Sequence, residues 1–200
     1  MSARTHRLSG LLIWAAVVVI ILLALFASAS SPFLQWRDPV YQLASFAGIG
    51  AFVLMLFQPL LATGLVPGLP GYGGRRVHFY LGLLVVALVS VHVGALWITS
   101  PPDVVDALLF VSPTPFSHWG VGAMWALFAA AVVASLRRFL PIRYRNWRRL
   151  HVTLVTTAVA GTVLHMLLIE GVMEPLSKVA LCIVVVSALL IALARRNQRV

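Results

Sequence analysis

The chain has few charged residues, and very few of them are acidic. Charged residues make up 10% of its 200 residues, with only five Asp or Glu against fifteen Lys or Arg, for a net charge of +10. The surface of a soluble domain needs a far larger charged share. Cysteine is also scarce: Cys182 stands alone, so an internal disulfide is excluded. Long polar stretches are missing as well, which argues against a water-soluble domain.

Most of the chain consists of apolar runs, with 61% hydrophobic residues and a mean hydropathy of +0.99. A helix that crosses a bilayer needs about 20 such residues. Backbone polar groups in lipid must be satisfied within the segment, so the runs are expected to be helices. We predict an all-α membrane protein, a six-helix transmembrane bundle forming a single domain over residues 1–200, with spans at about 11–27, 40–61, 78–98, 119–136, 150–169 and 179–194.

The first run allows two interpretations. Arg4 and Arg7 precede it, and Ala27-Ser28-Ala29 at its end resembles the cleavage site of a signal peptide. If it is retained, it is the first transmembrane helix.

The charges divide unequally between the two sides of the expected bundle. One side carries Arg37, Lys178 and all five acids, and the other carries the remaining thirteen arginines: Arg4, Arg7, Arg75, Arg76, Arg137, Arg138, Arg143, Arg145, Arg148, Arg149, Arg195, Arg196 and Arg199. The positive-inside rule therefore predicts that both termini are cytoplasmic. The net charge indicates topology and attraction to membrane lipid, and no nucleic-acid partner is expected.

Two connections stand out among the short loops. The outer segment 100–117 contains four prolines, which exclude a further span and predict a loop over the outer end of the bundle. The inner segment Arg137–Arg149 carries six arginines and Pro141.

A pattern of histidines occurs twice. Arg-Arg-x-His stands at residues 75–78 and again at 148–151, and a second histidine follows fourteen positions later, at His92 and His165. Fourteen residues advance a helix by about 21 Å and bring it within about 40° of four full turns. Each segment therefore carries two imidazoles on one face. Because one span separates the segments, they run in the same direction, and His78 is expected level with His151 and His92 level with His165.

Such histidines allow two interpretations. Each could be a structural residue hydrogen-bonded to a backbone carbonyl, as in a haem-free membrane scaffold or transporter. Ionisable groups inside a bilayer are, however, usually functional. A pair of imidazoles suits the two axial positions of a haem, whereas a tetrahedral zinc site needs more ligands. We therefore predict two haems, an inner and an outer one. With no Cys-x-x-Cys-His motif they would be b-type, held by His78, His92, His151 and His165.

Other residues near the four histidines are candidates for contact with the haems. Arg76 and Arg149 are membrane anchors and also candidate partners for haem propionates, since arginine matches carboxylates in two-point contacts. Gly82 and Gly161 either admit a flat macrocycle or serve ordinary helix packing. His118 is either an interfacial residue or part of an outer-face site.

The four histidines at this spacing, with Trp-Arg-Arg-Leu-His at 147–151, resemble the ferric reductase-like transmembrane domain, and the resemblance extends over about residues 40–195. That family includes ferric reductases, NADPH oxidases and the haem-binding membrane subunit of the bacterial methionine sulfoxide reductase system. The resemblance implies a six-helix bundle that passes electrons through b-type haem, with the four histidines as axial ligands.

The expected function is that of a cytochrome b of a bacterial inner membrane. Electrons would enter from a cytoplasmic-side donor and leave outside to ferric iron or a periplasmic reductase. Larger family members add an FAD and NAD(P)H domain. Here Gly48-x-Gly50 and Gly71-x-Gly73-Gly74 lack a strand–helix context, so no FAD or NAD site is expected. The donor would be a separate flavoprotein or a quinol, the latter as in the methionine sulfoxide reductase system. No catalytic residue is predicted, and enzymatic activity of the chain itself stays open.

Overall fold

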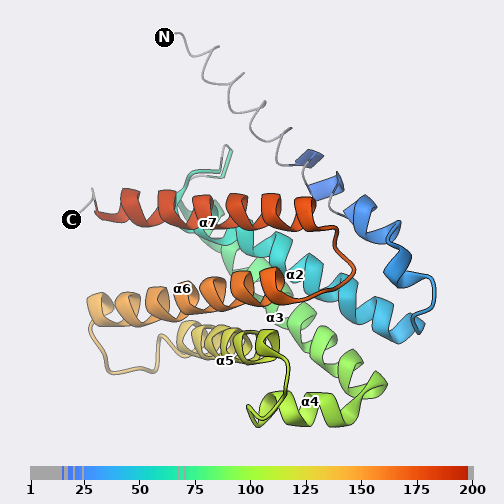
Figure 1. Ribbon diagram of the computed structural model, residues 1–200. Helices are drawn as coiled ribbons and strands as arrows, with labels where there is room; N and C mark the ends of the chain where they lie inside the picture. The colour runs from blue at the N-terminus through green and yellow to red at the C-terminus, as the bar shows by residue number, and fades with distance from the viewer. Residues whose placement is uncertain are drawn as a thin grey trace.

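The computed structural model describes residues 15, 18, 19, 21–23, 25–66, 68, 69 and 71–197, and over these residues it contains helices and no strand (Figure 1). Five long helices dominate: α2 (Pro39–Thr63), α3 (Gly71–Thr99), α5 (Pro115–Ser135), α6 (Tyr144–Leu168) and α7 (Pro175–Asn197). The short elements are the 3₁₀ helix η1 (Pro32–Leu34) and α4 (Pro101–Leu108). All five long helices are long and apolar enough to cross a membrane, which makes this a multi-pass membrane protein. Eight of the 17 residues of the first predicted span, 11–27, lie outside the described residues, so the count of six spans is not tested.

Local signals explain where the helices begin and end. The Asp38 carboxylate accepts the Val40 N–H at 2.7 Å, and Pro39 starts α2. Gly64 ends α2 in the left-handed region, at φ 69°. Before α7, the Glu174 carboxylate accepts the N–H groups of Leu176 and Ser177, and these hydrogen bonds lower the pKa of Glu174.

The prediction of a loop over residues 100–117 is wrong in its first half, where α4 is helical. Pro101 and Pro102 occupy its first turn, where the missing N–H of proline costs no hydrogen bond. The Ser100 hydroxyl donates to the Asp103 carboxylate at 2.5 Å at the same end. The helix packs against α3 and α5, and at eight residues it is too short to cross a bilayer.

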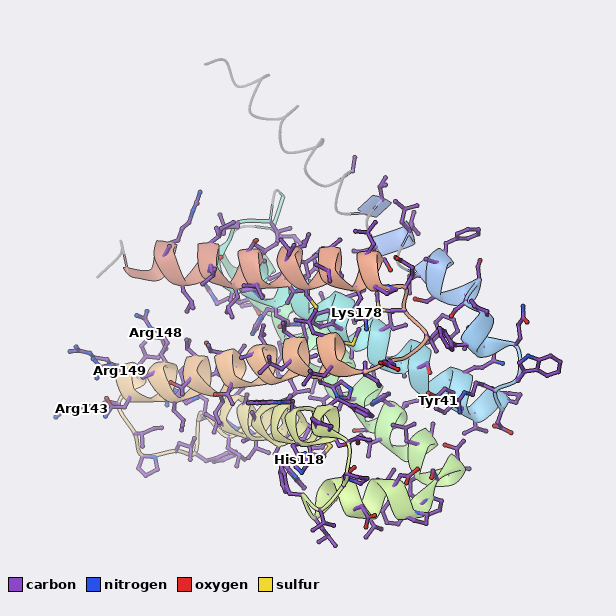
Figure 2. All side chains as sticks on the ribbon, viewed as in Figure 1. Tyr41, His118, Arg143, Arg148, Arg149 and Lys178 are labelled. Carbon is purple, nitrogen blue, oxygen red and sulfur yellow. The ribbon has the colours of Figure 1, made fainter. Side chains whose placement is uncertain are left out.

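The long helices form two hairpins, α2 with α3 and α5 with α6, and α7 packs on α2 and α6 (Figure 1). Fully buried side chains of α2, α3 and α7 lie at the centre of the core: Phe52 and Leu56 of α2, Val85 of α3, and Leu181 and Val185 of α7. Arg143, Arg148 and Arg149 extend from one end of α6, whereas Tyr41 and Lys178 lie toward the other end of the bundle (Figure 2). These three arginines and the lysine are thus separated along the helices.

Candidate functional site

The structure brings the four histidines together as two pairs, each with one member on α3 and one on α6. The ring centroids of His78 and His151 lie 6.5 Å apart with their planes at 74°. About four helical turns further along α3 and α6, His92 and His165 lie near each other. The helices α3 and α6 therefore run in the same direction, and the pairs are the ones expected from the fourteen-residue spacing.

All four imidazoles are oriented in the same way. Each ring places its Nδ1 against a backbone carbonyl of the helix that precedes it in its hairpin: His78 on Gln58 O at 3.1 Å, His92 on Ala44 O at 2.7 Å, His151 on Ala130 O at 3.2 Å and His165 on Phe116 O at 2.9 Å. A carbonyl oxygen can only accept a hydrogen bond, so Nδ1 carries the proton and donates it. In this tautomer the lone pair of a neutral ring is on Nε2, as metal ligation through that atom requires.

The carbonyl acceptors repeat as the histidines do. Ala44 and Gln58 are fourteen residues apart on α2, and Phe116 and Ala130 are fourteen residues apart on α5. Each hairpin thus presents two oriented imidazoles about four helical turns apart. A group bound by one pair receives one ligand from each hairpin.

Two glycines make room for the rings of His92 and His165. A Cβ added at Gly48 would lie 2.9 Å from His92 Nδ1, and one added at Gly120 would lie 2.7 Å from His165 Nδ1. Each glycine stands four residues after the carbonyl acceptor of that histidine, so any side chain there would displace the ring from its hydrogen bond. Neither glycine was predicted as a site residue, although their offset of 72 residues was a detectable signal.

The glycines chosen from the sequence serve the hairpins instead. A Cβ at Gly161 would meet Ala123 Cβ and Trp119 O of α5 at 3.0 Å, and one at Gly82 would meet the Gln58 side chain of α2 at 3.8 Å. Both contacts are with the neighbouring helix of the same hairpin. Ordinary helix packing is the interpretation that this geometry supports.

His78 alone has a side-chain amide beside it. With the Gln58 amide turned to accept the Gly82 N–H at 3.0 Å, its nitrogen lies 2.7 Å from His78 Nδ1 and 3.2 Å from His78 O. The backbone carbonyl and the amide nitrogen of Gln58 thus both face Nδ1. The carbonyl favours the tautomer with a free Nε2, whereas donation by the amide would require the opposite tautomer.

The two predicted arginines, Arg76 and Arg149, lie at the end of the bundle that carries His78 and His151. Arg76 lies on the surface beside Tyr80, with its guanidinium carbon 5.9 Å from the ring centroid, and Arg149 is exposed on the first turns of α6 (Figure 2). His118 lies apart from the four histidines and donates from Nε2 to Phe110 O at 3.1 Å, in the turn after α4. This hydrogen bond links the start of α5 to the turn after α4.

The donor set indicates which groups the site can hold. Among the described residues no three His, Cys, Asp or Glu side chains gather around a common point. Metal–imidazole bonds of about 2 Å on either side of one metal atom, plus about 1 Å from each nitrogen to its ring centre, give a centroid separation of about 6 Å. The 6.5 Å between His78 and His151 fits two axial ligands on one metal. A haem, whose macrocycle supplies the other four ligands, suits such a pair.

A comparison with protein families identifies the chain. The model of the ferric reductase-like transmembrane component matches residues 47–162, more than half of the sequence, and the chain belongs to this family. The match includes His78, His92 and His151 and ends three residues before His165. The predicted resemblance is thus confirmed, and it indicates electron transfer in a membrane. No curated protein and no solved structure matched the chain.

Proposed function

We propose that the protein is a b-type cytochrome of a bacterial inner membrane that carries electrons from a cytoplasmic-side donor, through two bis-histidine haems, to an outer-side acceptor. His78 and His151 hold the inner haem, and His92 and His165 hold the outer one. The acceptor is ferric iron or a periplasmic reductase, and the donor is a separate flavoprotein or a quinol. Both termini face the cytoplasm, where the arginine-rich end lies.

One observation carries this proposal: all four imidazoles place Nδ1 within hydrogen-bond distance of a backbone carbonyl. A structural histidine needs any one partner for either nitrogen. Four rings that all turn Nδ1 toward a backbone carbonyl are typical of metal ligands that bind through Nε2, because such a hydrogen bond orients the ring.

The residues of the chain then have distinct tasks. Bound haem supplies a one-electron couple, whose potential depends on ligands, hydrogen bonds and burial. The carbonyls of Ala44, Gln58, Phe116 and Ala130 hold the ligand rings. Arg76 and Arg149, at the end of the bundle that carries His78 and His151, would supply positive charge for the propionates of a haem held by that pair.

The proposal predicts two haems per chain. A pyridine haemochrome assay on purified protein should give a haem-to-polypeptide ratio close to two, and the dithionite-reduced spectrum should be that of a low-spin b-type cytochrome. A reproducible ratio of one would leave a single-haem protein without a path across the membrane. A ratio of zero would favour the haem-free scaffold.

The arginine-rich segment 137–149 predicts how a protein donor docks. Arg143 and Arg145 are exposed at the start of α6 and belong to the six arginines of this segment. A positive patch accelerates association with an acidic partner, and salt weakens that attraction. Substituting Glu for both should slow haem reduction by an acidic flavoprotein about tenfold at low salt and leave the spectrum unchanged.

The control for this prediction is Arg37→Glu, a charge reversal at the opposite end of the bundle. Stopped-flow reduction measured against ionic strength distinguishes the two donors. A rate of haem reduction that changes neither with salt nor with the charge reversals at Arg143 and Arg145 would contradict docking of a protein donor on this segment. It would favour a quinol that enters from within the membrane.

A further inference from the structure

An aromatic column connects the arginine-rich surface to one histidine of the inner pair. The ring of Trp147 lies parallel to that of His151, with 5.6 Å between centroids and 9° between planes. Tyr144 stacks on Trp147 from the first turn of α6, at 5.7 Å and 27°. Tyr144 is 60% exposed, whereas Trp147 and His151 are partly buried. The column therefore runs from the surface to the candidate ligand.

Helix α5 fixes the column in place. The indole N–H of Trp147 donates to Val133 O at 2.9 Å, and His151 Nδ1 donates to Ala130 O, three residues away on the same helix. These carbonyls lie on adjacent turns of one rigid helix. Trp147 can therefore neither rotate nor slide without breaking its own hydrogen bond, and its flat face restricts rotation of the His151 ring.

A cation covers the column. The guanidinium carbon of Arg137 lies 5.5 Å from the Trp147 ring centroid and 5.9 Å from that of Tyr144. Such distances allow cation–π attraction, which places a positive charge over the ring that stacks on His151. The adjacent Arg138 lies instead on Phe139, at 4.6 Å.

The other hairpin has no such column, despite the repeat. The positions 73 residues before Tyr144 and Trp147 are Gly71 and Gly74. A Cβ at Gly74 would lie 2.5 Å from Leu69 O, so no side chain fits there. Of His78 and His151, only His151 stacks on a tryptophan. The stacking is therefore not part of the repeat that supplies the four histidines.

We propose that Trp147 is a positioning residue for the inner haem, which orients the His151 imidazole and couples the charge of Arg137 to the haem. This inference rests on the proposed function. The stacked indole keeps the His151 plane at a set angle to that of His78 and excludes water from its face. A nearby positive charge favours the haem form that has gained an electron, so Arg137 raises the potential of the inner haem.

The test is a redox titration with electron paramagnetic resonance of the full-length protein in detergent. In low-spin ferric haem the g values report the angle between the two imidazole planes. Trp147→Leu should shift the g values of the inner haem and lower its potential, and Trp147→Phe, which keeps a stacked ring, should restore most of both. Arg137→Gln should change the reduction equilibrium three- to tenfold toward the oxidised form, where tenfold corresponds to about 59 mV for one electron.

Two matched variants serve as controls. Trp125→Leu removes a tryptophan of α5 that pairs with Phe128 and not with a histidine, and Arg138→Gln removes the neighbouring charge outside the column. Both should leave the inner haem unchanged. If Trp147→Leu loses the haem altogether, Trp147→Phe and Arg137→Gln decide the question.

The inference and the proposed function fail in different ways. Haem-free wild-type protein would refute the proposed function before any variant is made. Haem-loaded variants at Trp147 and Arg137 with wild-type g values and potential would refute the positioning role alone, and so would equal shifts in the two controls.

Discussion

Replacing His78 or His151 with alanine is expected to remove the same haem, the inner one, and to lower the haem content from two per chain to about one. The reason is the geometry of the pair: its ring centroids are 6.5 Å apart, and each hairpin contributes one ring. His92→Ala and His165→Ala should remove the other haem. Low-temperature absorption spectra and haem quantification of the four variants provide the measurement.

His118→Ala is the matched control, because this histidine contacts Phe110 O and neither pair. It should keep both haems. If His78→Ala and His165→Ala removed the same spectral component, the pairing across α3 and α6 would be wrong, and with it the parallel direction of these helices.

The second large effect, loss of the outer haem, is expected when Gly48 or Gly120 is replaced with alanine. Gly120→Ala places a methyl group 2.7 Å from His165 Nδ1, and Gly48→Ala places one 2.9 Å from His92 Nδ1. Carbon cannot approach so closely, so the imidazole must leave its carbonyl and lose its orientation. Each variant should lose the outer haem and retain the inner one, as shown by haem quantification and by redox titration of what remains.

Two other helical glycines offer controls that change only the backbone propensity. A Cβ at Gly94 of α3 or at Gly122 of α5 meets no atom outside its own helix within 4 Å. Alanine favours a helix by about 1 kcal/mol over glycine, so both control variants should fold at least as well as the wild type. Wild-type haem content in Gly48→Ala and Gly120→Ala would refute the role of these glycines.

Hydropathy predicted much of the fold, because apolar length and backbone satisfaction restrict what a bilayer accepts. The five helices α2, α3, α5, α6 and α7 extend over the last five predicted spans and begin up to seven residues earlier. The error came at α4, where the prolines of residues 101 and 102 predicted a loop. In the first turn of a helix proline loses no hydrogen bond, so its presence cannot distinguish a short helix from a loop.

The pairing of the histidines could be predicted because the fourteen-residue spacing places each pair on one helix face. Their carbonyl partners could not, since every residue carries a carbonyl and only packing decides which one meets a ring. The role of Gly48 and Gly120 could be predicted only in part. Their repeat is visible in the sequence, but small residues are common in membrane helices and serve several purposes there. The stacking of Trp147 on His151 follows from their four-residue separation on a helix, yet its fixation by Val133 needs the packed α5.

The division of the ligands between two hairpins has a consequence for the lifetime of the protein in a cell. Only three residues of α3 are buried, Gly74, Val85 and Ala95, so this helix relies on few contacts beyond its own hairpin. A group ligated by His78 and His151, and another by His92 and His165, would act as two cross-links between the halves of the chain. Ligands that bind only the assembled state stabilise it by mass action. Chains made during a shortage of cofactor would therefore separate into their hairpins more readily and be degraded, so that the abundance of the protein follows the supply of cofactor.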